Sequence, residues 1–344
     1  MKTVNTAAAI SRFGDTSVIA LIRQPRRPPR RGEIEVMVEA TSVNPIDVRR
    51  RAGYGRKLFT LLGAAHFPLV LGNDFVGIVS AVGAGVLAFR EGDAVFGAKP
   101  PSSTGSHATH IIVRADHAAH QPASMGNTPV RALAALPYNF TTVMRAFAGA
   151  GLNSENARGR DVLIHGASGR LGVLATRTLT AWGANVTAVC GTSGMDTCCN
   201  AGAVCVIDRY EQSLHDITHR FAATLNFANW EDETALLKLL ASDAIGHATT
   251  VHPLLGNLDH GLLRGAIAII RQKKYMRSHV PKGARYAWTV FAPDKHALHY
   301  LANNALMYTA LTTCVDFPLA QAALAHSHVE QGRPGHAILL PTQS

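Results

Sequence analysis

No stretch of this sequence stays apolar for long enough to cross a bilayer. A membrane-spanning helix needs about 20 consecutive apolar residues, and the apolar runs of this 344-residue chain end well before that length. Residues 1–21 also lack the basic-then-apolar order of a signal peptide. These absences predict a cytoplasmic protein without a membrane span.

Cysteine is missing from the first half of the chain, and the five cysteines of the second half are not spaced as a disulfide framework would require. Two of them are adjacent in sequence. We therefore expect reduced thiols. The five are Cys190, Cys198, Cys199, Cys205 and Cys314.

Charged residues are also few, at 16%, against a hydrophobic share of 47%. This balance is typical of globular rather than disordered proteins. Because 344 residues exceed the length at which a single core stops growing, the chain predicts two domains. The net charge of +10 suits an anionic partner, either nucleic acid or a phosphate-bearing cofactor.

The densest basic run, residues 23–31 (RQPRRPPRR), is interrupted by prolines that prevent a helix. We interpret it as an exposed connection between two strands. No aromatic stacking motif accompanies the run, so it does not favour a nucleic-acid partner.

Alternating apolar residues and glycine turns predict a β-rich, barrel-like domain in the first ~125 residues. Its strands are expected at residues 33–43, 69–83, 92–98 and 107–113. After Pro122 apolar bursts alternate with alanine-rich helical segments, which is typical of a doubly wound α/β domain. Strands are expected there at residues 162–164, 204–207, 223–227, 248–252 and 266–270.

The central motif is the glycine turn Gly166-Ala-Ser-Gly169-Arg-Leu-Gly172, between an apolar strand and a helix that begins near Leu171. Glycines at this spacing let the backbone turn tightly, let a pyrophosphate approach the N–H groups and let the helix pack on the strand. With a second strand ending at Cys190, the segment forms a complete βαβ unit. We therefore expect it to bind a dinucleotide.

The end of the second strand discriminates between NADH and NADPH. An acidic residue there would bind the ribose 2′-hydroxyl and repel a 2′-phosphate, but the residues present are Gly191, Thr192 and Ser193. Small hydroxyl residues can donate to phosphate oxygens. Arg209, at the end of the next strand, can supply positive charge. The sequence favours NADPH.

Motifs of a known enzyme group follow one another along nearly the whole chain. They include NPIDVRRRAGYG (residues 44–55), LGNDFVGIVSAVG (71–83), ALPYNFTTVMRAF (135–147) and HGASGRLG (165–172). In this order they resemble the zinc-free quinone oxidoreductase branch of the medium-chain dehydrogenase/reductase superfamily. The short motifs NPID, GYG, LPY, GASG and VTAVC are especially similar to those of the reticulon-interacting NADPH oxidoreductases.

The resemblance implies an α/β fold with a GroES-like catalytic domain and a Rossmann domain built on a doubly wound parallel sheet. Residues 1–128 and 269–344 would form the first and residues 129–268 the second. A homodimer is a further expectation, because such dimers are frequent in the family. The residues implied to bind the cofactor are Asn44, Thr142, Gly166, Ser168, Gly169, Arg170, Leu171, Gly172, Gly191, Thr192, Ser193, Arg209 and, through its backbone, His252.

The sequence departs from the family pattern near the expected cofactor. Arg170 replaces the second glycine of the usual GG pair, and a long cation there could clamp the pyrophosphate or obstruct it. The segment from Asn226 to Asn229 stands where the family has D-x-V-G-G, so the turn under the ribose is altered. Arg209 stands where a tyrosine is usual, and His336 where a lysine is usual.

Zinc ligands are absent from the places where zinc-dependent relatives hold the metal. No cysteine precedes Cys190, and residues 44–47 and 72–74 contain neither Cys nor His. We therefore expect no metal site. Without a metal, a hydrogen-bond donor must polarise the carbonyl oxygen of the substrate. Tyr54 is the candidate donor, and protonation of the product by water is the equal alternative.

The sequence thus predicts a zinc-independent oxidoreductase that uses NADPH to reduce a small-molecule quinone, enone or related carbonyl by hydride transfer. One alternative is a catalytically impaired NADPH-binding protein that acts through a protein or RNA partner, which the basic charge, Arg170 and the altered segment from Asn226 to Asn229 suggest. Another is an enoyl-thioester reductase of a biosynthetic pathway, which would share the fold and the cofactor.

Overall fold

The computed structural model describes residues 4–122 and 130–341, and the chain forms two compact units. Unit 1 joins Met1–Thr141 to Ala292–Ser344, and unit 2 is Thr142–Phe291. The domain boundary predicted between residues 128 and 129 lies outside the described residues. The boundary predicted between residues 268 and 269 stays a prediction. Each unit is described by itself.

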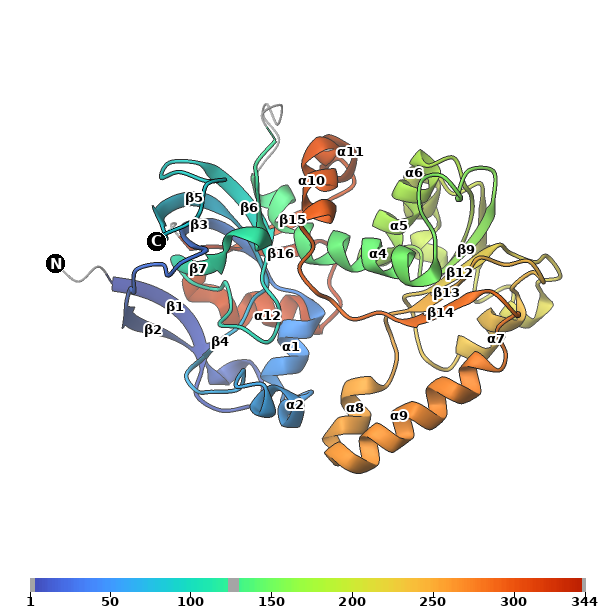
Figure 1. The fold of residues 1–344 in the computed structure, drawn as a ribbon, viewed down its shortest axis with the longest axis horizontal. Helices are drawn as coiled ribbons and strands as arrows, with labels where there is room; N and C mark the ends of the chain where they lie inside the picture. Colours follow the sequence, from blue (N-terminus) through green and yellow to red (C-terminus); the bar gives the residue numbers. More distant parts are fainter. Residues whose placement is uncertain (1–3, 123–129, 342–344) are drawn as a thin grey trace. The chain divides into compact units, whose positions relative to one another are not determined.

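Unit 1 is built mainly from antiparallel strands (Figure 1). Its strands are β1 (Val4–Ile10), β2 (Ile19–Pro25), β3 (Glu33–Ser42), β4 (Leu69–Val70), β5 (Asp74–Val82), β6 (Ala94–Ala98), β7 (His110–Arg114), β8 (Ala118–His120), β15 (Cys314–Pro318) and β16 (His336–Leu340). Its helices are α1 (Pro45–Arg51), α2 (Arg56–Leu61), α3 (Val130–Ala134), α10 (Lys295–Asn303), α11 (Ala305–Thr309) and α12 (Ala322–Glu330).

The larger sheet of unit 1 has the order β15-β16-β3-β5-β6-β8, with β7 also paired to β3. Strand β3 shows why this sequence forms a sheet. Its alternate residues Ile34, Val36 and Val38 are fully buried on one face, where they contribute to a common apolar core. Strand β16 pairs with β3 through Ile338 and Ser42, so the C-terminal segment completes the sheet begun by the N-terminal one.

Unit 2 contains a parallel sheet of six strands in the order β11-β10-β9-β12-β13-β14, which is the Rossmann order. The strands are β9 (Asp161–His165), β10 (Asn185–Cys190), β11 (Cys205–Asp208), β12 (Ala223–Asn226), β13 (Gly246–Thr249) and β14 (Arg285–Trp288). The helices are α5 (Arg170–Ala181), α6 (Met195–Ala201), α7 (Glu233–Lys238), α8 (Leu254–Asp259) and α9 (Leu262–Arg277), and α4 (Pro137–Ala150) runs into this unit from unit 1.

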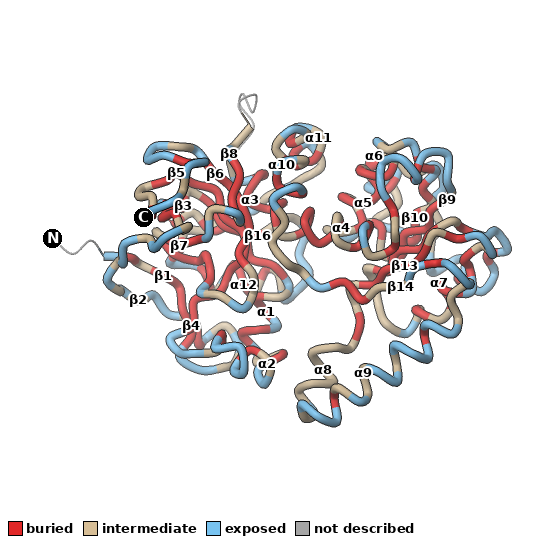
Figure 2. The backbone as a smooth tube through the Cα atoms, in the orientation of Figure 1, coloured by how far each residue is buried: buried red, intermediate tan, exposed pale blue. Residues whose placement is uncertain are grey.

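The central strands of this sheet are buried along most of their length, as Figure 2 shows for β10 and β13. Every residue of β12 and of β13 is buried, which agrees with a parallel sheet that is covered on both faces. The predicted doubly wound parallel sheet of the second unit is therefore confirmed, and the first unit is β-rich as predicted.

One predicted strand is wrong. Residues 266–270 (AIAII) lie inside the 16-residue helix α9, and β14 takes the place at the edge of the sheet. A short apolar burst fits a strand or a helix equally well by periodicity. Here Ile267 and Ile270 are 44% and 67% exposed, so the burst does not belong to a buried strand.

Residues 26–31 of the basic run connect β2 to β3, as expected, whereas residues 23–25 are the last three residues of β2. Within residues 4–122 and 130–341, no helix combines the length and the apolar character that a bilayer span would need. The cytoplasmic location stays a prediction.

Candidate functional site

The predicted glycine turn joins β9 to α5 in unit 2. Gly166 has a φ of +79°, which side chains rarely allow. A Cβ on Gly172 would lie 2.5 Å from the Cα of Ala167, so the first turn of α5 packs directly on the backbone of the glycine turn. Gly169 caps α5 without a side-chain hydrogen bond. The first N–H groups of a helix have no intrahelical partner, so this end of the 12-residue α5 can bind an anion.

The turn is held against the neighbouring strand by its own amides. The N–H groups of Gly166 and Ala167 both donate to the carbonyl of Val189 in β10, at 3.0 and 3.1 Å. Ser168 lies against Gly194, since a Cβ on that glycine would overlap the Ser168 side chain. The glycine turn and the segment after β10 are thus brought together. Arg170 and Leu171, the first residues of α5, are partly exposed.

Arg209 directly follows β11, the strand after β10, as the sequence predicted. Its N–H donates to the carbonyl of Cys190 at 2.9 Å. Its Nη2 donates to the hydroxyl of Tyr210 at 2.7 Å, and its guanidinium carbon is 4.8 Å from the centre of that ring. Tyr210 in turn packs on Gly191, where a Cβ would be 3.1 Å from the ring. The structure therefore places an exposed cation beside Gly191.

Asp208, beside Arg209, is a residue that sequence reasoning missed. A hydrogen bond from the Thr192 side chain, and one from the N–H of Tyr210 at 3.0 Å, lower the pKa of its carboxyl group. The Thr192 hydroxyl thus donates to a carboxylate, and the neighbouring Ser193 is also exposed. The signal was present in the sequence, because Asp208 directly precedes Arg209 at the end of a strand.

The altered segment after β12 still forms a closed turn. The buried Asn226 donates from Nδ2 to the carbonyl of Asn229 at 2.7 Å, and its Oδ1 accepts from the N–H of Ala228 at 3.2 Å. A Cβ on Gly166 would lie 3.0 Å from the nitrogen of Ala228. Asparagine hydrogen bonds therefore shape the turn in contact with the glycine turn, where the family uses glycines.

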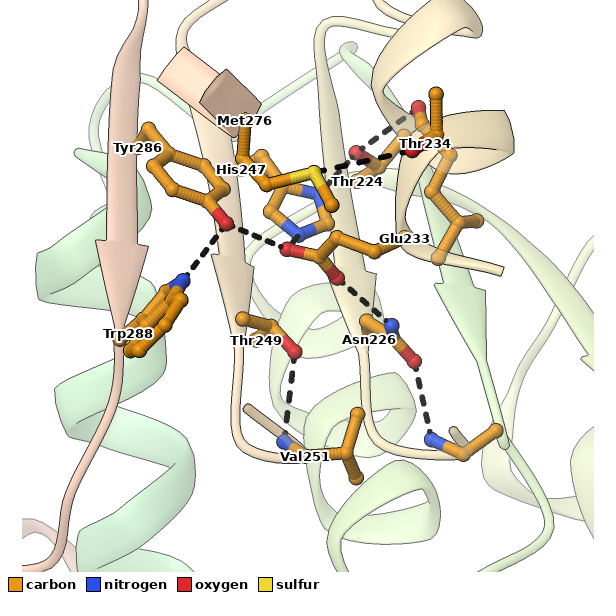
Figure 3. A network of polar contacts seen from close by, with 12 residues as sticks. Thr224, Asn226, Glu233, Thr234, His247, Thr249, Val251, Met276, Tyr286 and Trp288 are labelled. Atoms are coloured by element: carbon orange, nitrogen blue, oxygen red, sulfur yellow. Dashed lines mark hydrogen bonds and ion pairs between the residues drawn. The ribbon is translucent and has the colours of Figure 1, made fainter. Parts of the chain in front are cut away.

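A buried polar network supports the carboxyl ends of the last strands (Figure 3). Glu233, at the start of α7, is fully buried and accepts from His247 Nε2 at 3.1 Å and from the Tyr286 hydroxyl at 3.0 Å. It also accepts from Asn226 Nδ2 at 2.8 Å. Burial raises the pKa of Glu233, but the charge of His247 and these hydrogen bonds outweigh it, so the pKa lies below its usual value. The network ties α7 to β12, β13 and β14.

His252 follows β13 and is buried by a stacking contact. Its ring lies 5.0 Å from that of Trp288 at an interplanar angle of 2°. Its Nε2 is 3.0 Å from the carbonyl of Thr289, and burial lowers its pKa. The side chain is thus used inside unit 2, which leaves the backbone of His252 as the group that could meet a ligand.

In unit 1, Asn44 lies in a buried cluster of hydrogen bonds at the start of α1. Its Nδ2 donates to Asp74 Oδ2 at 2.7 Å and to Ser42 Oγ at 3.0 Å. Its Oδ1 accepts from Asn139 Nδ2 at 3.2 Å. Asp74 also accepts from the hydroxyl of Ser42 and from the N–H of Tyr138, each at 2.5 Å. The Asn44 amide is therefore fixed in one orientation.

Asp74 is the principal functional candidate that sequence reasoning missed in unit 1. It is fully buried, and burial raises the pKa of its carboxyl group to about 7 although hydrogen bonds from Ser42 and Asn44 oppose the rise. The signal was a lone carboxylate within the apolar run LVLGNDFVGIV. Such a residue is rarely buried without a role.

In the segments where zinc-dependent relatives hold their metal, the side chains form hydrogen bonds within the protein. Asp47 accepts from the N–H of Asn44 at 2.8 Å and from the N–H of Gly72 at 2.9 Å. His107 Nε2 lies 3.1 Å from the carbonyl of Ser42. In the part of the chain that the structure describes, no group of three or more His, Cys, Asp or Glu side chains could hold a metal ion.

Tyr54 lies on a different segment of unit 1, between α1 and α2. It is partly exposed, its N–H donates to the carbonyl of Arg49 at 2.9 Å, and the Arg49 guanidinium carbon is 5.7 Å from its ring centre. With Arg50 and Phe59 it lines a cavity of about 10 Å³, which has room for a single water. Thr142 is buried on α4.

Comparison with known proteins agrees with this geometry. Residues 30–123 match the alcohol dehydrogenase GroES-like domain family. The protein "NAD(P)H oxidoreductase RTN4IP1, mitochondrial" of Danio rerio is 30% identical over 354 residues, which cover 96% of this chain and 89% of that protein. That name places the relative in mitochondria, and the compartment of this chain stays a prediction.

Solved structures show the same fold. The quinone oxidoreductase of Coxiella burnetii superposes with a TM-score of 0.78 at 22% identity and covers 98% of this chain and 99% of its own. The Escherichia coli quinone oxidoreductase, solved with NADPH, gives 0.72 at 21% identity, with 98% and 100% covered. This chain therefore belongs to the family of the reticulon-interacting NAD(P)H oxidoreductases and has the fold of the quinone oxidoreductases.

Proposed function

We propose that this chain binds NADPH on unit 2 and uses it, without zinc, to reduce a quinone, an enone or a related carbonyl. The observation that carries the proposal is the glycine turn fused to α5. Gly172 packs closely on the glycine turn and Gly169 caps α5 without a side chain, so an anion can approach the backbone at this end of the helix. Membership of the oxidoreductase family supports a nicotinamide cofactor.

We assign the pyrophosphate to the glycine turn and the start of α5. The backbone N–H groups there provide donors, and the helix dipole adds a partial positive charge. Arg170 would add a full charge as a clamp on the pyrophosphate. The residues in this role are Gly166, Ser168, Gly169, Arg170, Leu171 and Gly172.

We assign the 2′-phosphate of NADPH to Arg209, with Ser193 and Gly191 beside it. The guanidinium is exposed next to Gly191, where a phosphate could accept two parallel hydrogen bonds from it. The negative charge of Asp208 opposes binding of the 2′-phosphate. Because Thr192 and the N–H of Tyr210 already donate to that carboxylate, part of its charge is satisfied.

The bound cofactor supplies a hydride. For the reduction itself, the chain must orient the substrate and the nicotinamide and deliver a proton. We assign Asn44, Thr142 and the backbone of His252 to the nicotinamide. The Asn44 amide is held by Asp74 and Ser42, so it is preorganised for this task. Tyr54 or a water molecule would polarise the carbonyl and protonate the product.

We infer zinc independence from the same cluster. In the described residues, the groups at the metal positions are an amide and two carboxylates, Asn44, Asp47 and Asp74, and each already binds hydrogen-bond donors. Catalytic zinc sites use nitrogen and thiolate ligands with an open position instead. Turnover that survives complete removal of zinc by a chelator would agree with this part of the proposal, and restoration by zinc alone would contradict it.

The experiment that tests the function is oxidation of NADPH by the full chain with a panel of acceptors. The panel contains benzoquinones, naphthoquinones, simple enones and a crotonyl thioester. Turnover with quinones or enones is the expected result. Turnover with the thioester alone would make the chain an enoyl-thioester reductase. Tight NADPH binding without turnover on any acceptor would make it a binding protein that has lost catalysis.

A further inference from the structure

Unit 1 contains a hollow of about 560 Å³ that no residue assigned to the cofactor or to hydride transfer lines. It is bounded by the end of β2, the start of β3, the strand β7 and the loop at residues 99–105. Small-molecule sites in proteins span roughly 300–1,000 Å³. The hollow is therefore large enough for a ligand of its own.

Lys99 lies in the wall of this hollow and is 5% exposed. Its backbone is anchored to Asn73, because its N–H donates to the Asn73 carbonyl at 2.8 Å and Asn73 Nδ2 donates to the Lys99 carbonyl at 2.9 Å. The ammonium nitrogen donates to the carbonyl of Ile112 at 2.7 Å. A lysine ammonium has three donors, so two remain for a ligand in the hollow.

The other strong cations of the hollow are already paired with carboxylates, whereas Lys99 is not. In residues 4–122 and 130–341, no carboxylate oxygen lies within 4.0 Å of the Lys99 ammonium. The existing pairs are Arg26 with Glu35, Arg27 with Glu33, and Arg114 with Asp116. A buried ammonium without a counter-ion is costly, so an anion that entered the hollow would be stabilised there.

The lowered pKa of Lys99 agrees with the absence of a counter-ion beside its ammonium group. Burial, followed by the charge of Arg27, lowers its pKa to about 7, and the charge of Glu33 opposes this only in part. His117 also faces the lysine, and the Lys99 charge contributes to the lowered pKa of that histidine. His110 and the Arg26–Glu35 pair complete the charged groups around the hollow.

We propose that this hollow binds a small organic monocarboxylate, with its carboxylate on Lys99 and its apolar part on the walls. The lining also includes Val70, Ala108 and Ile111, which offer apolar contacts to a hydrocarbon chain or ring. One unpaired ammonium matches one negative charge. The neighbouring arginines, which would suit a phosphate, are engaged by glutamates.

Calorimetric titration of the full chain with hexanoate tests the proposal. The variants are Lys99→Met, which keeps most of the length of the side chain but removes its charge, and Lys282→Met, which removes an exposed lysine of unit 2 as a matched control. We expect hexanoate to bind the parent chain and the control equally, and to bind Lys99→Met at least about tenfold more weakly. Equal binding to all three, or to none, overturns the proposal.

Two further readouts separate the proposal from a loss of folding and from cofactor binding. Above pH 7, binding of hexanoate should take up protons, because the bound carboxylate raises the pKa of Lys99. Proton uptake that persists in Lys99→Met contradicts the assignment. Saturating NADPH should leave hexanoate binding unchanged. Displacement of hexanoate by NADPH, or tight binding of inorganic phosphate in its place, would show a general anion site instead and overturn the proposal.

Discussion

Asp74 is the residue whose environment differs most from that of a surface carboxylate. It is fully buried, and each of its oxygens accepts from donors of other segments. These bonds hold the Asn44 amide, yet burial raises the pKa of Asp74 to about 7. The side chain is therefore ionised at some cost in stability, and the cost should vary with pH.

The variant Asp74→Asn tests this cost. Between about pH 4 and pH 7 the folded chain keeps a proton on Asp74 that the unfolded chain releases, so this residue makes the fold less stable as pH rises through that window. A pKa difference of about 3 corresponds to about 4 kcal/mol. The amide of the variant does not titrate. In urea unfolding, the free energy of unfolding of Asp74→Asn minus that of the parent chain should increase between pH 4 and pH 7. A difference that does not change with pH would contradict the account.

Arg209 is the residue to which we assign the preference for NADPH. Its removal in Arg209→Ala should weaken binding of NADPH by about tenfold to a hundredfold, because a charge-assisted contact to phosphate contributes about 1.5–3 kcal/mol. Binding of NADH should change much less. The matched control is Arg160→Ala, an exposed arginine of unit 2 that directly precedes the first residue of β9. Equal losses for NADPH and NADH in fluorescence titrations would refute the role of Arg209.

At the scale of elements, the βαβ unit is the part that sequence alone predicted best. The turn Gly166–Gly172, the start of α5 and the end of β10 all lie within a residue or two of their expected places. Glycine spacing is a local constraint, so it is readable from local sequence. The apolar burst inside α9 was misread as a strand because only its tertiary surroundings distinguish the two.

Close packing of α5 on the glycine turn gives a prediction for two glycines. In Gly172→Ala the new Cβ meets backbone atoms of Gly166 and Ala167, which cannot move as a side chain would. We expect a loss of about 1–3 kcal/mol of stability or more, together with loss of NADPH binding. In Gly256→Ala, inside α8, the Cβ meets nothing within 4 Å. That control should be stabilised by about 0.5–1 kcal/mol. Thermal unfolding with equal effects of both changes would contradict the packing argument.

At the scale of the whole molecule, the order of the motifs resembles that of a known enzyme group. This resemblance predicted two units and a chain that returns to the sheet of its first unit. Strand β16 pairs with β3, and the predicted bounds of the returning segment stay a prediction. The buried clusters were not predictable, because Asn44, Asp74 and Asn139 are far apart in sequence and meet only through the fold. The same applies to Glu233, His247 and Tyr286 in unit 2.

The net charge of +10 gives a prediction for the whole chain. A basic protein raises the local concentration of an anionic cofactor, and salt screens this attraction. The Debye length falls from ~30 Å at about 0.01 M salt to ~3 Å at about 1 M. Stopped-flow measurements should therefore show NADPH association slowing steeply over that range while dissociation changes less. An association rate that does not depend on salt would indicate that the charge plays no part in cofactor capture.

Transfer of a hydride from NADPH to an acceptor is the central claim, and an isotope experiment tests it most directly. The full chain is given NADPH dideuterated at C4 of the nicotinamide, with an enone and with a quinone in parallel. The account predicts slower turnover than with unlabelled NADPH for the acceptor that is reduced, and deuterium on the β-carbon of the saturated ketone if the enone is reduced. Turnover that produces a saturated ketone without deuterium, or no turnover with either acceptor, would contradict it.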